Sequence, residues 1–141
     1  MTGSRRNLFL TAAAAFFLVV FAVMISWLPA EAQTACNQAG NHVIHVAKTA
    51  GSGHLTDCDT ARISKQNHHT ITWQASGNDT LTIQFNKNGN PFQDFWCQNQ
   101  KQCTTGTIGP NAQTGTTYNY KVTLNSGGNT YTEDPGVIID P

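Results

Sequence analysis

The sequence predicts an all-β fold, an antiparallel sandwich preceded by an N-terminal signal helix. After residue 32, apolar and polar residues alternate in short runs, clusters of Gly, Asn and Ser separate the runs, and no amphipathic helical pattern exceeds two turns. With 141 residues, one folded domain is expected. We therefore divide the chain into a signal peptide (1–32), an N-terminal strand with a disulfide-tied segment (33–59) and a sandwich body (60–141), with 33–141 forming a single domain.

The first 32 residues have the order of regions that is typical of a bacterial secretory signal. Arg5 and Arg6 precede an uncharged apolar run, 8–28, and small residues follow at 30–32, which predicts cleavage after Ala32. The arginine pair also fits a twin-arginine signal, and the apolar run is long enough to remain as an uncleaved membrane anchor. We favour a cleaved signal of the general secretory (Sec) route over both. The protein is then periplasmic or secreted, with no membrane contact after cleavage.

Period-two alternation predicts the strands of the sandwich. In the runs 69–75 and 80–86 alternate residues are apolar, so each run has one apolar face. Turn-forming residues at 76–79 lie between these runs and predict a β-hairpin. A second turn, 125–129, precedes a closing strand whose edge can pair with its own chain or with a second copy, a route to self-association. The predicted strands are 42–47, 60–64, 69–75, 80–86, 117–125 and 137–139.

Charged residues are too few and too balanced to define a partner. The chain has 8 Lys and Arg against 8 Asp and Glu, and only 11% of its residues are charged. Nucleic-acid binding requires a basic surface, so we expect no nucleic-acid partner. Asn, Gln and Thr supply the polar surface instead, and recognition has to depend on neutral groups.

Four cysteines in an exported domain of this size predict two structural disulfides. Of the three connectivities that four cysteines allow, we favour Cys36–Cys58 and Cys97–Cys103. The first bond closes a loop of about 20 residues and is worth roughly 3 kcal/mol in the loop-entropy description. The second is expected only to stiffen one loop. Because the chain contains no C-x-x-C pair, neither a redox-active pair nor a cysteine zinc site is expected.

Five segments between residues 60 and 140 follow one another as ARISKQNHHTITWQ, LTIQF, a Pro-Phe loop, GTTYNYKVTL and DPGVIID. This order resembles the cupredoxin-like sandwich, which implies a Greek-key, immunoglobulin-like arrangement. A blue-copper site takes Cys, His and Met around the last two strands. Residues 118–141 contain none of these, so the resemblance implies a sandwich without that copper site. GTTYNYKV is also similar to a strand of fibronectin type III domains, where Tyr118 would make a corner hydrogen bond; we rank this resemblance second.

The long loop after the fourth predicted strand carries the leading candidate site. Phe92, Phe95 and Trp96 precede the proposed Cys97–Cys103 bond and are flanked by Gln and Asn side chains. Aromatic faces beside amides suit a carbohydrate or a protein partner. The alternative is that these rings fold over the open end of the sandwich and complete its core. The leading prediction is a non-enzymatic binding module without a cofactor.

All five histidines lie between residues 42 and 69, which motivates a rival prediction. A periplasmic copper- or zinc-binding protein would use imidazole ligands from this segment. On a strand His42 and His45 face opposite ways, as do adjacent positions, so only one histidine of each pair can join a common site. The alternative is that these histidines are solvated polar side chains on the surface and bind no metal. The candidates are His42, His45, His54, His68 and His69.

No motif in the chain predicts catalysis. The sequence has no G-x-S-x-G, no H-E-x-x-H and no phosphate-binding glycine loop. Asp57 and Asp59 are expected to accept hydrogen bonds within a loop, and Glu133 and Asp134 to lie in a turn. Neither acidic pair has a nucleophile near it in sequence. We therefore do not expect an enzyme.

Overall fold

Two β-sheets form the described part of the chain, which in this computed structural model is residues 36–48, 53–86 and 89–141. Within these residues the structure has strands and no α-helix, so the predicted all-β sandwich is confirmed. The predicted signal helix, 1–32, lies outside the described residues. The strands are β1 (His42–Val46), β2 (Thr60–Ser64), β3 (Ile71–Ala75), β4 (Thr80–Phe85), β5 (Cys97–Gln100), β6 (Gln102–Thr104), β7 (Thr117–Ser126), β8 (Asn129–Glu133) and β9 (Gly136–Asp140).

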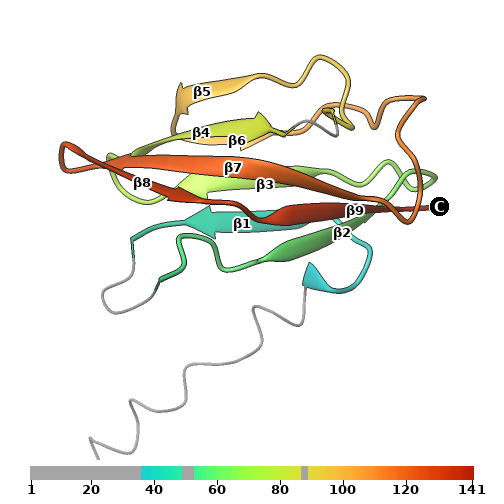
Figure 1. Ribbon diagram of the computed structural model, residues 1–141, viewed down its shortest axis with the longest axis horizontal. Coiled ribbons are helices and arrows are strands. Elements are labelled where there is room, and N and C mark those ends of the chain that lie inside the picture. The colour runs from blue at the N-terminus through green and yellow to red at the C-terminus, as the bar shows by residue number, and fades with distance from the viewer. Residues whose placement is uncertain (1–35, 49–52, 87–88) are drawn as a thin grey trace, which may run out of the picture. The chain divides into compact units, whose positions relative to one another are not determined.

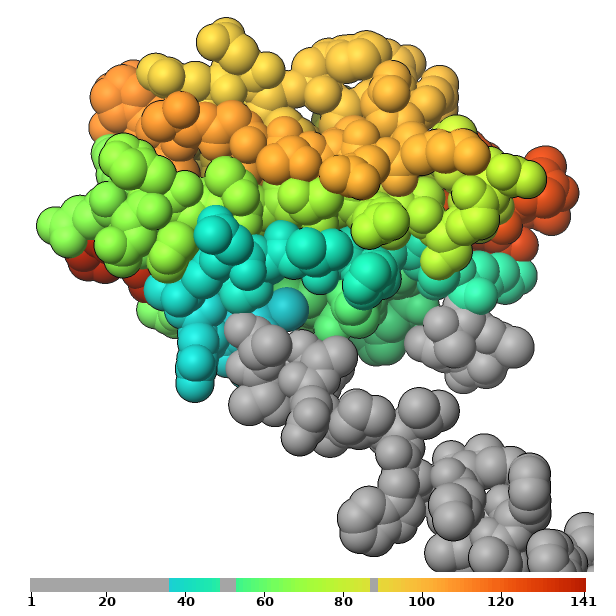
Figure 2. Space-filling view, turned by 180° about the vertical axis from the view of Figure 1, so that it is seen from behind, coloured from blue at the N-terminus to red at the C-terminus, as the bar shows by residue number. Residues whose placement is uncertain are grey.

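The two sheets differ in size. One has three strands in the order β1-β3-β6, and the other has six, in the order β2-β9-β7-β4-β5 with β8 paired to β7 (Figure 1). Figure 2 shows the face of the smaller sheet, where residues of β1 (cyan), β3 (yellow-green) and β6 (orange) form adjacent bands. All six predicted strands are present within one or two residues of their predicted ends.

The prediction of a purely antiparallel sandwich is wrong, because β1 pairs with β3 and β2 pairs with β9 in parallel. Between β1 and β3 the chain passes through β2 of the other sheet, and between β2 and β9 it passes through strands of both sheets, so in each case it returns in its original direction. Period-two alternation reports which face of a strand is buried and carries no information on the direction of its neighbour.

The predicted hairpin between β3 and β4 is also wrong. The turn itself forms: Gly77 has φ +58°, and the Asp79 N–H donates to the Ser76 carbonyl at 3.1 Å. However, β3 and β4 belong to different sheets, so this turn connects the two layers. A hairpin and a turn between layers have the same alternation and the same turn residues, so the local sequence does not distinguish them.

The C-terminal strands pair within the chain. A two-residue turn joins β7 to β8, and its residues Gly127 and Gly128 both have positive φ, as hairpin turns of this length require. The closing strand β9 is hydrogen-bonded to both β2 and β7, so it offers no free edge to a second copy. The sequence did not predict β8, because its residues have no clear apolar alternation and are mostly exposed.

The core lies between the sheets and centres on Trp73 of β3 and Tyr120 of β7. Both side chains are fully buried, and their rings meet edge to face at 5.2 Å. The Trp73 indole N–H donates to the Tyr120 hydroxyl at 3.1 Å, which satisfies the buried indole. Burial raises the pKa of the Tyr120 phenol, although the hydrogen bond from Trp73 acts in the opposite direction.

The two disulfides are Cys36–Cys58 and Cys97–Cys103, the favoured pairing. The second bond does more than stiffen a loop, because it links β5 of the larger sheet to β6 of the smaller one. Two disulfides indicate an oxidising compartment, extracellular or periplasmic. Within the described ranges the structure has no helix that is long and apolar enough to cross a membrane.

Candidate functional site

The three aromatic residues of the long loop have different environments. Phe92 was predicted to contact a partner, but its side chain is only 4% exposed and belongs to the core, so it has little surface to offer. Phe95 is half-buried, and its ring centroid lies 5.5 Å from that of Trp73 and 5.9 Å from that of Phe85. Trp96 is 69% exposed. The loop therefore both completes the core and presents one aromatic ring to solvent.

The backbone around Phe92 is fixed by a second segment of the same loop. Phe92 forms a β-bridge with Ile108, and the Gln93 N–H donates to the Thr107 carbonyl at 2.9 Å. A Cβ on Gly106 would lie 2.7 Å from the Gln93 carbonyl oxygen, so only glycine fits there without a shift. These contacts hold the backbone that leads to Trp96.

Trp96 lines two grooves. The larger, of about 490 Å³, runs along β4 and β5, and none of the described residues that line it is charged. The smaller, of about 350 Å³, lies between the aromatic segment and residues 104–107. Phe95 and Trp96 line both grooves. The described lining of the larger groove is Thr82, Ile83, Gln84, Phe85, Asn86, Gly89, Asn90, Phe95, Trp96, Cys97 and Gln98.

Strand β5, which carries part of this lining, is bulged and held at several points. The β4–β5 register shifts between Leu81 and Ile83, and Asn99 has φ +51°, a conformation that Asn tolerates better than most residues. The Asn99 N–H donates to the Thr82 hydroxyl at 3.1 Å. Its side-chain oxygen accepts from the Asn125 amide at 3.2 Å. These bonds and the disulfide at Cys97 fix one wall of the groove.

Tyr118 makes the hydrogen bond expected of a tyrosine corner. Its hydroxyl accepts from the backbone N–H of Gln113 at 2.8 Å. The bond ties the start of β7 to the loop that precedes it. This role is structural, and the bond alone does not identify a family.

The structure does not bring the five histidines together. His42 is buried, and its Nε2–H donates to the Arg62 carbonyl at 2.7 Å. The Nδ1 atom of His69 accepts from the Ser64 N–H at 3.2 Å, a second structural role. Among the described residues, the only group of three metal-capable side chains contains one histidine, so no site made of several of these histidines forms there. The other two, His45 and His68, are exposed.

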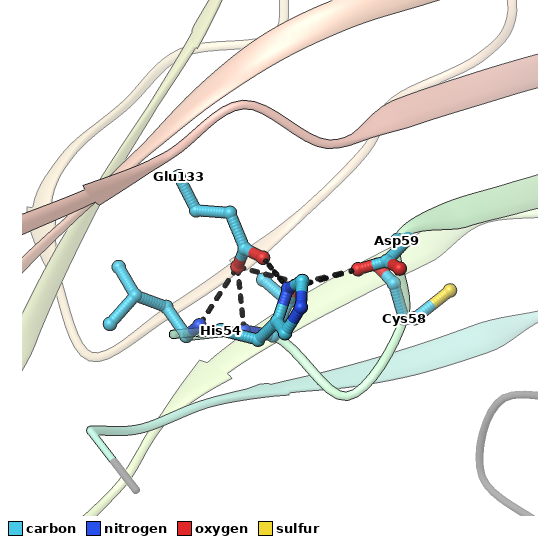
Figure 3. Close-up of polar contacts among 6 residues, drawn as sticks. His54, Cys58, Asp59 and Glu133 are labelled. Carbon is cyan, nitrogen blue, oxygen red and sulfur yellow. Dashed lines mark hydrogen bonds and ion pairs between the residues drawn. The ribbon is translucent and has the colours of Figure 1, made fainter. Parts of the chain in front are cut away.

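The group that does form consists of His54, Asp59 and Glu133. The His54 Nδ1–H donates to Glu133 Oε1 at 2.8 Å and lies 3.5 Å from Asp59 Oδ1. Figure 3 shows the imidazole between the two carboxylates. The side chains of His54 and Asp59 are 63% and 57% exposed, and that of Glu133 is 14% exposed. We call these three residues the His54 cluster.

The other oxygen of Glu133 is held by the segment that follows His54. Glu133 Oε2 accepts from the Leu55 N–H at 2.9 Å, the Thr56 N–H at 2.8 Å and the Thr56 hydroxyl at 2.9 Å. One carboxylate oxygen is thus committed to the loop, and the other faces the imidazole. Glu133 therefore anchors the loop to the end of β8 and also belongs to the cluster.

These contacts shift the pKa of both partners. The hydrogen bond to Glu133, and then the charge of Asp59, raise the pKa of His54 above its usual 6.5. Partial burial acts to raise the pKa of Glu133. The hydrogen bonds from His54, Thr56 and Leu55 outweigh burial and lower that pKa below its usual 4.5. The two shifts have the directions expected of an ion pair.

Sequence reasoning missed the part that Glu133 and Asp59 play. It assigned Glu133 to a turn and Asp59 to a loop, while Asp57 does act as predicted and accepts the His45 N–H at 3.0 Å. Glu133 lies 79 positions from His54, so no short motif joins them. The only signal in the sequence was that an acidic residue ends the run NTYTE beside the apolar closing strand.

No protein-family model matches this chain, and no curated protein matches it either. The cupredoxin-like and fibronectin-like resemblances therefore remain predictions. The candidate sites of the described residues are therefore the aromatic ring of Trp96 with its grooves and the His54 cluster.

Proposed function

We propose that this protein is an exported, non-enzymatic binding module that recognises a neutral carbohydrate chain through Trp96 and the groove along β4 and β5. The proposal rests on one observation: Trp96 is 69% exposed beside a groove whose described lining has no charge. A sugar ring has an apolar face that stacks on an aromatic ring and hydroxyls that bond to amides. The groove offers both kinds of partner in one place.

The lining chemistry favours a carbohydrate over a protein partner. Gln84, Gln98 and Asn90 supply amides, and Thr82 supplies a hydroxyl. Protein interfaces usually have a larger apolar centre, whereas Val43 and Trp96 are the only large apolar side chains that are exposed among the described residues. Val43 belongs to β1, in the other sheet, so the two do not form one patch.

The wider proposal keeps the predicted scaffold and location. The sandwich is a copper-free, cupredoxin-like Greek key, exported by a bacterium through the general secretory route to the periplasm or beyond. The parallel pairs β1–β3 and β2–β9, the two disulfides and the apolar run at 8–28 are compatible with this. Self-association was predicted at the closing strand, whose two edges are both paired within the chain; the edge strand β1, where Val43 is exposed, is the place we propose for it instead.

The test is a binding titration of the purified, disulfide-bonded protein with oligosaccharides. Probes are neutral gluco-, xylo- and chito-oligosaccharides, and an oligogalacturonate serves as the anionic contrast. We expect saturable binding of at least one neutral probe and weaker binding of the anionic one. Trp96→Ala should reduce the affinity about 30-fold or more, as for an aromatic hot spot, and Trp96→Tyr should restore part of it.

Two outcomes of this titration contradict the proposal. One is that no neutral probe binds. The other is that binding occurs and is unchanged in Trp96→Ala, which would place the ligand elsewhere. Gln74→Ala, an exposed position on β3 in the smaller sheet, is the matched control and should leave the affinity unchanged.

A further inference from the structure

We propose that the His54 cluster is a binding site for a divalent transition-metal ion such as Zn²⁺, separate from the carbohydrate groove. One imidazole nitrogen and one oxygen from each of two carboxylates lie within 4.8 Å of one another. An ion placed between atoms this close can bond to all three with only small side-chain movements.

The donor set selects the kind of ion. Imidazole nitrogen is a good ligand for Zn²⁺ and Cu²⁺ and is not a usual ligand for Ca²⁺ or Mg²⁺. The ion takes the place of the proton that His54 Nδ1 shares with Glu133, and that proton is released to water on binding. Two carboxylates with a neutral imidazole give a net charge of −2, which one divalent cation balances. The chain holds its cysteines in disulfides, so no thiolate competes for the ion in the oxidised protein.

The cluster is supported by the surrounding structure. Glu133 is held in place by the three hydrogen bonds to its Oε2 atom, which leave its Oε1 atom directed at His54. Such outer contacts orient a ligand and raise the affinity of a metal site. The backbone of Asp59 is also fixed, because its carbonyl accepts the Gly136 N–H at 2.8 Å. Two of the three ligands therefore have rigid attachments.

The exposure of the site predicts how it works. Because His54 and Asp59 are more than half exposed, water can complete the coordination shell, as in open metal sites. The bound ion links the segment 54–59, which precedes β2, to the end of β8. The site is therefore expected to stabilise this region and to exchange its ion readily.

The test uses the purified, disulfide-bonded protein after removal of metals with a chelator, titrated with Zn²⁺ alone and then with Ca²⁺ alone. We expect one Zn²⁺ per chain, bound at micromolar concentration or tighter, and an increase in melting temperature on Zn²⁺ addition. Co²⁺ in place of Zn²⁺ should give the visible absorption of nitrogen and oxygen ligation. Asp59→Asn and His54→Gln should each weaken Zn²⁺ binding about tenfold or more.

Two matched variants control for general loss of charge. Asp94→Asn and His68→Asn change exposed residues outside the cluster, at positions where Asn tolerates the positive φ. Neither should alter Zn²⁺ affinity. Asp59→Asn should keep the melting temperature of the metal-free protein, which separates loss of a ligand from loss of the fold.

Three results would overturn the proposal. The first is the absence of saturable Zn²⁺ binding. The second is an affinity that Asp59→Asn and His54→Gln leave unchanged. The third is Ca²⁺ binding as tight as that of Zn²⁺, because the imidazole would then not be a ligand. None of these results bears on carbohydrate binding at Trp96.

Discussion

The Trp96 groove and the His54 cluster both pair a residue that anchors the structure with a residue presented to solvent. In the groove, half-buried Phe95 packs on Trp73, and its neighbour Trp96 is exposed. In the cluster, Glu133 holds the loop after His54, and Asp59 is exposed. The described lining of the groove along β4 and β5 is uncharged and comes from one stretch of sequence, 82–98, whereas the His54 cluster is charged and is assembled from distant segments. The comparison shows that anchoring and binding can be separated experimentally in each region.

Phe95→Ala should give the largest effect. It removes a ring that contacts Trp73, Phe85 and Phe92, so we expect the free energy of unfolding to fall by about 3 kcal/mol. Trp96→Ala should change it by less than about 0.5 kcal/mol, because that side chain is exposed. Urea denaturation measures both. Equal losses in the two variants would mean that Trp96 is also a core residue.

Glu133→Gln and Asp59→Asn test whether anchoring and metal binding can be separated in the His54 cluster. The amide cannot accept all the hydrogen bonds that converge on the carboxylate, and we expect a loss of about 2 kcal/mol in the metal-free protein. Asp59→Asn should cost less than about 0.5 kcal/mol there. The measurement is again urea unfolding, now with a chelator present. A Glu133→Gln protein as stable as wild type would show that the loop does not depend on this anchor.

Gly106→Ala tests whether the close approach of Gly106 to the Gln93 carbonyl positions the loop that carries Trp96. The added methyl group would meet the Gln93 carbonyl at 2.7 Å, so we expect a loss of about 1–2 kcal/mol and a changed environment for Trp96. Unfolding and the tryptophan emission maximum report these effects. Gly53→Ala, where nothing lies within 4 Å, is the control. If both variants behave alike, the close approach at Gly106 does not position the loop.

The pH dependence of stability should be the smallest effect, since His54 is exposed and its ion pair is screened. The contribution of His54 is complete below pH 6.5 and is lost as pH rises through its raised pKa. The contribution of Glu133 is complete above pH 4.5 and is lost as pH falls through its lowered pKa. In chelator, the pair should therefore stabilise most between these values. His54→Gln should remove the alkaline decline, and an unaltered decline would contradict this assignment.

The sequence predicts individual strands better than their partners. The alternation in β7 is local, and its residues Tyr118, Tyr120, Val122 and Leu124 are buried as expected. Which strands pair depends on how the chain crosses between the two sheets. For this reason β3 and β4 were wrongly predicted to pair as a hairpin. The run 129–133 gave no alternation from which β8 could be recognised.

In the candidate sites too, features that are local in the sequence could be predicted, and contacts between distant segments could not. The aromatic segment was recognisable because its rings are neighbours in sequence, but which ring is exposed depends on packing against Phe85 and Trp73, which lie elsewhere in the chain. The His54 cluster was missed because Glu133 reaches it only through the β7–β8 hairpin. Contacts between distant segments are a product of the fold and leave no spacing to find.

The most direct test of the account is whether a neutral oligosaccharide covers Trp96. A protein produced without residues 1–32 has two tryptophans, Trp73, which is fully buried, and Trp96, so acrylamide quenching of its fluorescence reports chiefly on Trp96. We predict that the neutral oligosaccharide that binds in titration reduces the quenching constant in a saturable manner, and that oligogalacturonate does not. Binding without any protection of Trp96 would contradict the central claim that this ring forms the recognition surface.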